Sequence, residues 1–160
     1  MSQQTSYEIY AEKAQAGLIA DLRPVEISSH IWEDVESSPF GLFVVRGTAD
    51  GQALLPTAST DKVLGVCVNC KNYEMKRYED VMKIQTKGSV SVMRRGNIYV
   101  KITTDCAAGD DVYLRYASGA GSTILGSVGN AAVVDETVIV SGWEFETSGL
   151  AGDIVKIRAK

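Results

Sequence analysis

The sequence has a single histidine, His30, among 160 residues. Histidine is the side chain most often used as a general base near neutral pH, so a sequence with one histidine has few ways to form a common catalytic site. His30 occupies a polar position of its segment with no nucleophile pattern near it, and the simpler interpretation is a surface residue. We therefore predict no catalytic residue and expect that the protein is not an enzyme.

Long apolar runs and an excess of basic residues are also missing. No stretch of about 18 apolar residues occurs, so we expect no membrane-spanning helix and no membrane partner. The formal net charge is −4, whereas a protein that grips phosphate backbones needs a basic face. We expect no direct contact with nucleic acid.

The sequence has only three cysteines, Cys67, Cys70 and Cys106, which is an odd number. A structural zinc site usually needs four cysteine or histidine ligands, and only Cys106 and His30 remain beside the closely spaced pair. The N-terminus lacks the basic and apolar regions of a secretion signal, so we interpret the cysteines as reduced, buried thiols. We predict no metal ligand and no cofactor.

The sequence does contain clear alternation of apolar and polar residues in its middle part. Residues 89–92 (SVSV) alternate as a half-buried strand does, and so do residues 98–103 and 112–116. Turn residues stand between them, at 94–97 (RRGN) and 107–111 (AAGDD). Three short strands joined by tight turns predict an antiparallel meander, which we expect at the centre of an all-β domain.

The first 38 residues differ from the rest of the chain. We expect an extended arm here, and a short helix ending at Gly17 is the alternative, since residues 5–8 (TSYE) fit a capping box. Pro24 cannot donate a ladder hydrogen bond, so the strand-like residues around and after it are expected at a sheet edge or outside the sheet. Such an apolar arm needs a groove, in its own domain or in a neighbouring subunit. We divide the chain into an N-terminal arm, residues 1–38, and a body, residues 39–160.

Several short motifs, taken in their order and spacing along the chain, indicate a resemblance to a known protein family. They are residues 16–21 (AGLIAD), 27–29 (ISS), 39–48 (PFGLFVVRGT), 55–57 (LPT), 64–66 (LGV), 88–96 (GSVSVMRRG), 98–100 (IYV) and 108–113 (AGDDVY). Together they resemble the cement, or decoration, proteins of tailed-bacteriophage heads, and the resemblance covers most of the chain.

This resemblance implies both a fold and a function. The fold is an antiparallel β-sandwich or jelly-roll-like body with an extended N-terminal arm. The protein would bind the outer face of an assembled capsid, bridge neighbouring major capsid subunits and help the shell to withstand the pressure of packaged DNA. It would be made in the host cytoplasm and end on the outer surface of the virion. A homodimer and a homotrimer are both closed assemblies, and we favour the homodimer.

Eight residues are predicted at the interface with a capsid subunit or with a second copy. Most belong to the arm, while the two arginines are either a solvated turn or a salt bridge to an acidic partner surface. The eight are Leu18, Ile19, Asp21, Ile27, Ile31, Trp32, Arg94 and Arg95.

Two other functions fit the same sequence. One is a different virion part, a tail or baseplate β-module. The other is a carbohydrate-binding β-sandwich, which would use Tyr99, Tyr113 and Trp143 as stacking surfaces.

Overall fold

The computed structural model describes residues 14–21, 23–35, 37–69, 83–119 and 124–159. Within these ranges the chain forms ten β-strands and no helix, which confirms the predicted all-β class. Most of the residues for which a short helix was the alternative, residues 1–13, lie outside the described residues. The strands are β1 (Glu26–Trp32), β2 (Phe43–Arg46), β3 (Gln52–Leu54), β4 (Val63–Cys67), β5 (Ser89–Arg95), β6 (Asn97–Lys101), β7 (Asp111–Arg115), β8 (Val128–Gly129), β9 (Thr137–Phe145) and β10 (Ile154–Ala159).

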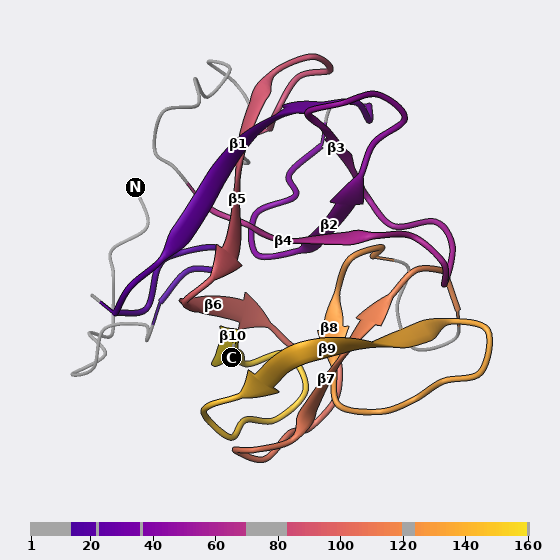
Figure 1. Cartoon of the computed structure of the whole chain (residues 1–160). Coiled ribbons are helices and arrows are strands. Elements are labelled where there is room, and N and C mark those ends of the chain that lie inside the picture. The colour runs from indigo at the N-terminus through magenta and orange to yellow at the C-terminus, as the bar shows by residue number, and fades with distance from the viewer. Residues whose placement is uncertain (1–13, 22, 36, 70–82, 120–123, 160) are drawn as a thin grey trace, which may run out of the picture.

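The strands form two layers, as Figure 1 shows. In one layer, β1, β3, β2, β4 and β5 follow one another around a closed barrel. In the other, β6, β10, β9, β7 and β8 form a five-stranded sheet. Paired strands run antiparallel, except for β1 and β3, which run parallel. The result agrees with the sandwich-like fold expected from the sequence.

The predicted meander of three paired strands is wrong, although all three strands exist. β5 belongs to the barrel, whereas β6 pairs with β10 and β7 pairs with β8 and β9 in the second sheet. Gly96 separates β5 from β6 with a φ of +125°, a conformation that favours glycine. The chain passes from one layer to the other at this residue instead of turning back in a hairpin.

The two layers share a core because adjacent residues of a strand face opposite sides. One set of side chains fills the barrel, and the other set packs on the second sheet. The first set contains Trp32, Val44, Ala53, Cys67, Ile84, Val90 and Val92. The second contains Phe43, Val66 and Met93, which join Ile98, Val112, Trp143, Phe145 and Ile157. Phe43 meets Trp143 edge to face, with ring centroids 5.3 Å apart, so an aromatic pair connects the layers.

The structure corrects the sequence-based placement of β1. This strand pairs with β5 on one side and with β3 on the other, so it is a strand of the barrel wall and does not lie at a sheet edge. Pro24 precedes the strand and costs it no ladder hydrogen bond. Trp32, predicted to dock on a partner, is fully buried, and its indole nitrogen donates to the carbonyl oxygen of Val35 at 3.1 Å.

Neighbouring residues of β1 should therefore respond very differently to truncation. Trp32→Ala removes a fully buried side chain, and we expect it to lower the free energy of unfolding by about 3–5 kcal/mol. Ile31→Ala is the matched control, because Ile31 is 49% exposed, and its loss should be about 1 kcal/mol or less. Urea unfolding followed by tryptophan fluorescence, which Trp143 alone supplies in Trp32→Ala, and by circular dichroism measures both losses. Equal losses would contradict the burial of Trp32.

Candidate docking surface

The described residues just before β1 lie against the edge of β6. Gly17 N donates to Tyr99 O at 2.7 Å, Tyr99 N donates to Leu18 O at 2.9 Å, and Ala20 N donates to Asn97 O at 2.9 Å. Ile19 forms a bridge with Ile98. The other side of β6 pairs with β10, so these residues cover an edge that would otherwise present unpaired backbone groups. For residues 17–20, the groove expected from the sequence is in their own chain.

Gly17 fits a narrow space between the two layers. Its carbonyl oxygen accepts from Asn69 N at 2.8 Å, just beyond β4, while its own nitrogen bonds to β6. A Cβ at this position would lie 2.9 Å from the backbone nitrogens of both Gly41 and Asn69, and its φ is +87°. A larger residue would push the segment away from the barrel or from β6.

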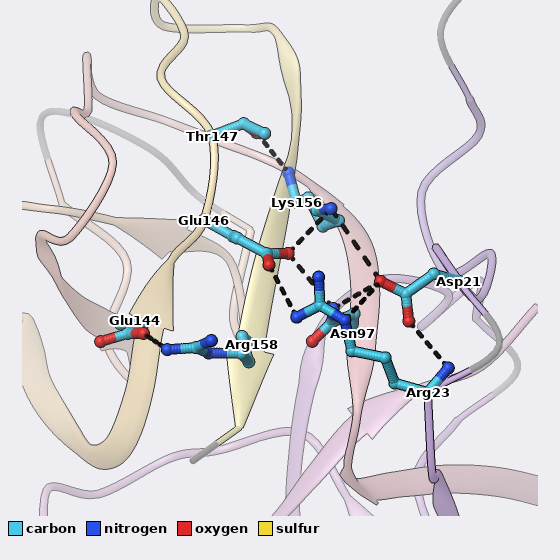
Figure 2. Close-up of polar contacts among 8 residues, drawn as sticks. All are labelled: Asp21, Arg23, Asn97, Glu144, Glu146, Thr147, Lys156 and Arg158. Atoms are coloured by element: carbon cyan, nitrogen blue, oxygen red, sulfur yellow. Dashed lines mark hydrogen bonds and ion pairs between the residues drawn. The ribbon is translucent and has the colours of Figure 1, made fainter.

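A polar cluster then fastens the segment to the second sheet (Figure 2). The side-chain nitrogen of Asn97, on β6, donates to Asp21 at 2.7 Å and to Glu146 at 3.2 Å. Lys156 Nζ, on β10, lies 2.8 Å from Glu146 Oε2 and 4.0 Å from Asp21 Oδ2. Arg23 Nη1 lies 2.9 Å from Glu146 Oε1, and Arg23 Nε lies 3.4 Å from Asp21 Oδ2. Asp21, predicted to contact a partner, makes its described contacts within the chain.

The cluster keeps both carboxylates ionised. The pKa of Asp21 lies below its usual value, chiefly because Asn97 donates a hydrogen bond to the carboxylate. The pKa of Glu146 is lowered chiefly by the hydrogen bond from Lys156, with a further contribution from Arg23. Partial burial acts in the opposite direction in both cases and is outweighed.

The sequence interpretation missed most of this cluster, although a signal was present. Glu144 and Glu146 stand two residues apart, and Lys156 and Arg158 do the same. Opposite charges at this spacing in two strands are typical of cross-strand pairs. Arg158 indeed lies opposite Glu144 in the β9–β10 ladder and forms an ion pair with it.

The outer face of β1 carries an exposed apolar stripe. Ile27 is 40% exposed and Ile31 is 49% exposed, and both point away from the side that Val90 and Val92 share with the barrel core. Val25, just before the strand and not among the predicted interface residues, is also exposed. The stripe is available to a partner. Of the remaining predicted apolar residues, Ile19 is exposed beside β6, and Leu18 is half-buried.

Arg94 and Arg95 end β5 and do not sit at a hairpin tip. The β1–β5 register shifts between Glu26 and Ile27, so Glu26 lies opposite Arg95 while Ile27 lies opposite Met93. Arg94 Nη1 lies 3.9 Å from Glu26 Oε1. Arg95 instead lines a hollow of about 270 Å³ between the barrel and the second sheet, together with Arg23, Pro24, Gly96, Asn97, Arg158 and Ala159.

His30 is half-buried, and not the surface residue that the sequence suggested. Its Nε2 lies 2.9 Å from Ser28 Oγ, and burial lowers its pKa. The other ring nitrogen is buried and meets no hydrogen-bond partner among the described residues.

A second hollow, of about 470 Å³, lies among the turns around Cys106 and is lined by aspartates. Burial raises the pKa of the Cys106 thiol, which therefore stays protonated. Cys67 and Cys106 are both buried, as predicted, while Cys70 lies outside the described residues. The aspartates accept backbone N–H groups: Asp110 from Ala107, Asp153 from Leu150 and Asp105 from Ala151. Across the described ranges, no group of three or more His, Cys, Asp or Glu residues is placed to hold a metal ion.

Comparison with known proteins identifies a protein family that matches this chain. The family described as structural cement protein (E217 gp24/Pam3 gp6) matches residues 3–160. No curated protein matches the chain by sequence. A solved chain from the capsid of Myoviridae phage XM1 has a TM-score of 0.72 and 17% identity, with 99% of this chain and 97% of that chain covered. The N base of head fiber gp8.5 in bacteriophage phi29 is less similar, with a TM-score of 0.41 and 10% identity over 86% of this chain and 95% of that chain.

Acid should loosen the segment that precedes β1. Because the folded pKa values of Asp21 and Glu146 are lowered, their pairing is complete above the ordinary carboxyl range and is lost as the pH falls through that range and below it. We expect hydrogen exchange at the Gly17, Ala20 and Tyr99 amides, corrected for intrinsic rates, to rise over this interval.

Substitution at one carboxylate separates this effect from general acid unfolding. In Glu146→Gln, exchange at the same amides should already be raised at neutral pH and should change less on acidification. Asp50→Asn is the matched control, because Asp50 is fully exposed and pairs only loosely with Arg46 at 3.8 Å. Wild-type protection that is equal at neutral and acid pH would contradict this role of the cluster.

Proposed function

The chain belongs to the family of phage structural cement proteins, and on that premise we propose that it binds the outer surface of an assembled phage head and bridges neighbouring major capsid subunits. The observation that carries this proposal is the extent of the family match, which spans residues 3–160 and so includes both layers of the fold. The family's role is structural and needs no catalytic group. The work of the protein is to stabilise the shell against the pressure of packaged DNA.

The fold suits this mechanical role because both layers contribute side chains to the core between them. The barrel and the second sheet are joined by buried side chains such as Phe43 and Trp143, so load applied to one layer is passed to the other through close packing. Each single contact with the shell needs only a low affinity. Many copies bound around a closed lattice reinforce one another, since every further contact forms at a high effective concentration.

The proposed interface uses the exposed members of the predicted set. Ile27 and Ile31 supply the apolar stripe on β1, and Ile19 adds an exposed side chain beside β6. Arg94 and Arg95 supply positive charge at the end of β5, and Leu18 is half-buried beside β6. Trp32 supports the stripe from inside the barrel, and Asp21 holds the preceding segment in place.

The partners follow from the same proposal. The major capsid protein is the principal partner, and a homodimer is favoured over a homotrimer as the bound form. With a net charge of −4 the chain is not suited to direct contact with DNA. The described residues include no helix long and apolar enough to cross a membrane. Synthesis in the host cytoplasm and assembly onto the outer capsid surface complete the proposal.

Co-sedimentation with purified heads that lack the protein tests the proposed function. The wild-type chain should pellet with heads and should raise the temperature at which they release DNA. Ile27→Ser with Ile31→Ser should weaken binding by about tenfold or more, because each side chain loses the gain from apolar burial. Ile139→Ser is the matched control, since Ile139 is 48% exposed on β9 and lies outside the proposed interface.

Two results would contradict parts of this proposal separately. A wild-type chain that stays in the supernatant at every head concentration would refute head binding. A wild-type chain that binds, with the β1 variant and the Ile139 variant binding equally well, would refute the placement of the interface on β1.

A further inference from the structure

The hollow at the end of β5 is lined by three arginines from three parts of the chain. Arg95 comes from the barrel, Arg158 from β10 of the second sheet, and Arg23 from the segment fastened by the polar cluster. They converge where Gly96 carries the chain from one layer to the other. Such a concentration of guanidinium groups is unexpected in a chain with a net charge of −4.

Charge is not balanced around this hollow. Arg23 is paired with Asp21 and Glu146, and Arg158 is paired with Glu144. Lys156 shares the first two carboxylates. Among the described residues no ion pair includes Arg95, and Glu26, opposite Arg95 in the ladder, pairs with Arg94 instead. Among the residues that the structure describes, Arg23, Arg158 and Lys156 therefore have carboxylate partners, and Arg95 is the lining arginine without one.

One lining residue, Arg158, also has an unused hydrogen-bond donor. The Nε–H of Arg158 is buried and finds no acceptor among the described residues. Leaving such a donor unpaired is costly. The paired carboxylates hold Arg23 and Arg158 in position, so an incoming anion would meet guanidinium groups that are already ordered.

Apolar surface adjoins the hollow. Pro24 forms part of its wall, and Val25 lies so close that a Cβ on Gly96 would be 2.7 Å from Val25 Cγ1. Val25 is 42% exposed and continues into the stripe of Ile27 and Ile31. A charged pocket beside an exposed apolar surface is typical of a protein-binding surface, where charge sets orientation and apolar contact supplies affinity.

We propose that this hollow, with Arg95 as its unmatched cation, receives an aspartate or glutamate side chain of the major capsid subunit. The inference rests on the proposed function and adds the chemistry of the contact. The hollow, with a volume of about 270 Å³, is large enough to admit a carboxylate side chain. A single surplus charge suits one carboxylate. A DNA backbone would require many cations over a longer track.

Arginine substitutions combined with chemical modification of the heads test this contact. Arg95→Ala should weaken co-sedimentation with heads about tenfold, and Arg95→Glu should weaken it further, as expected when one partner of a charge pair is removed or reversed. Arg46→Ala is the matched control, because Arg46 is an exposed arginine of the barrel that does not line the hollow. Thermal unfolding should be nearly unchanged in Arg95→Ala, since the side chain is exposed and forms no ion pair among the described residues.

Heads whose surface carboxylates have been converted to amides with carbodiimide and glycinamide complete a double-mutant cycle. Wild type and Arg46→Ala should lose affinity for the modified heads, down to the level of Arg95→Ala on untreated heads. Arg95→Ala itself should lose little more. If modification weakens Arg95→Ala as strongly as wild type, the two groups are not coupled and the inference fails.

The remaining outcomes are also decisive. Wild-type protein that does not bind untreated heads would overturn the proposed function and this inference with it. Wild-type binding with Arg95→Ala equal to Arg46→Ala would overturn this inference alone. A duplex DNA oligonucleotide bound by wild type and lost in Arg95→Ala would assign the hollow to phosphate and would overturn the carboxylate proposal.

Discussion

The packing of the barrel on the second sheet is the interaction on which the rest of the structure depends. Alternate side chains of the barrel strands serve two cores at once, so Val92 fills the barrel while Met93 packs on the sheet. Since a shift of one residue would exchange these sets, the register of the barrel is tightly specified. That register delivers the chain through Gly96 to β6, and β6 then offers its free edge to residues 17–20.

The polar cluster has a positional effect more than an energetic one. Its ion pairs are partly exposed, and such pairs contribute little to stability individually. However, Asp21 and Glu146 would repel each other without Asn97, Arg23 and Lys156 between them. By balancing these charges, the cluster sets the path of the chain into β1. The same path brings Arg23 to the arginine-lined hollow and leaves Val25 exposed beside it.

Much of the fold was predictable because it depends on local patterns. The alternation in residues 89–92 and 98–103 correctly indicated strands, and the turn role expected of Asp110 is confirmed by its bond from Ala107 N. The pairing of those strands was not predictable in the same way. An alternation with a period of two indicates that a segment is a strand but does not indicate which strand it pairs with. The tight turn expected at residues 94–97 is instead the point where the chain passes from the barrel to the second sheet.

The sequence by itself determined the all-β class, the family and the absence of the usual catalytic histidine pattern, because composition, alternation and motif order are properties of the chain alone. Only the tertiary structure decided which apolar residues are available. Ile31 and Trp32 are neighbours of similar hydrophobic character, yet one is exposed and the other is buried. It also decided that Arg23, Arg95 and Arg158 meet. The physical reason is that the face of a strand and the convergence of distant side chains are set by long-range packing, which no local pattern contains.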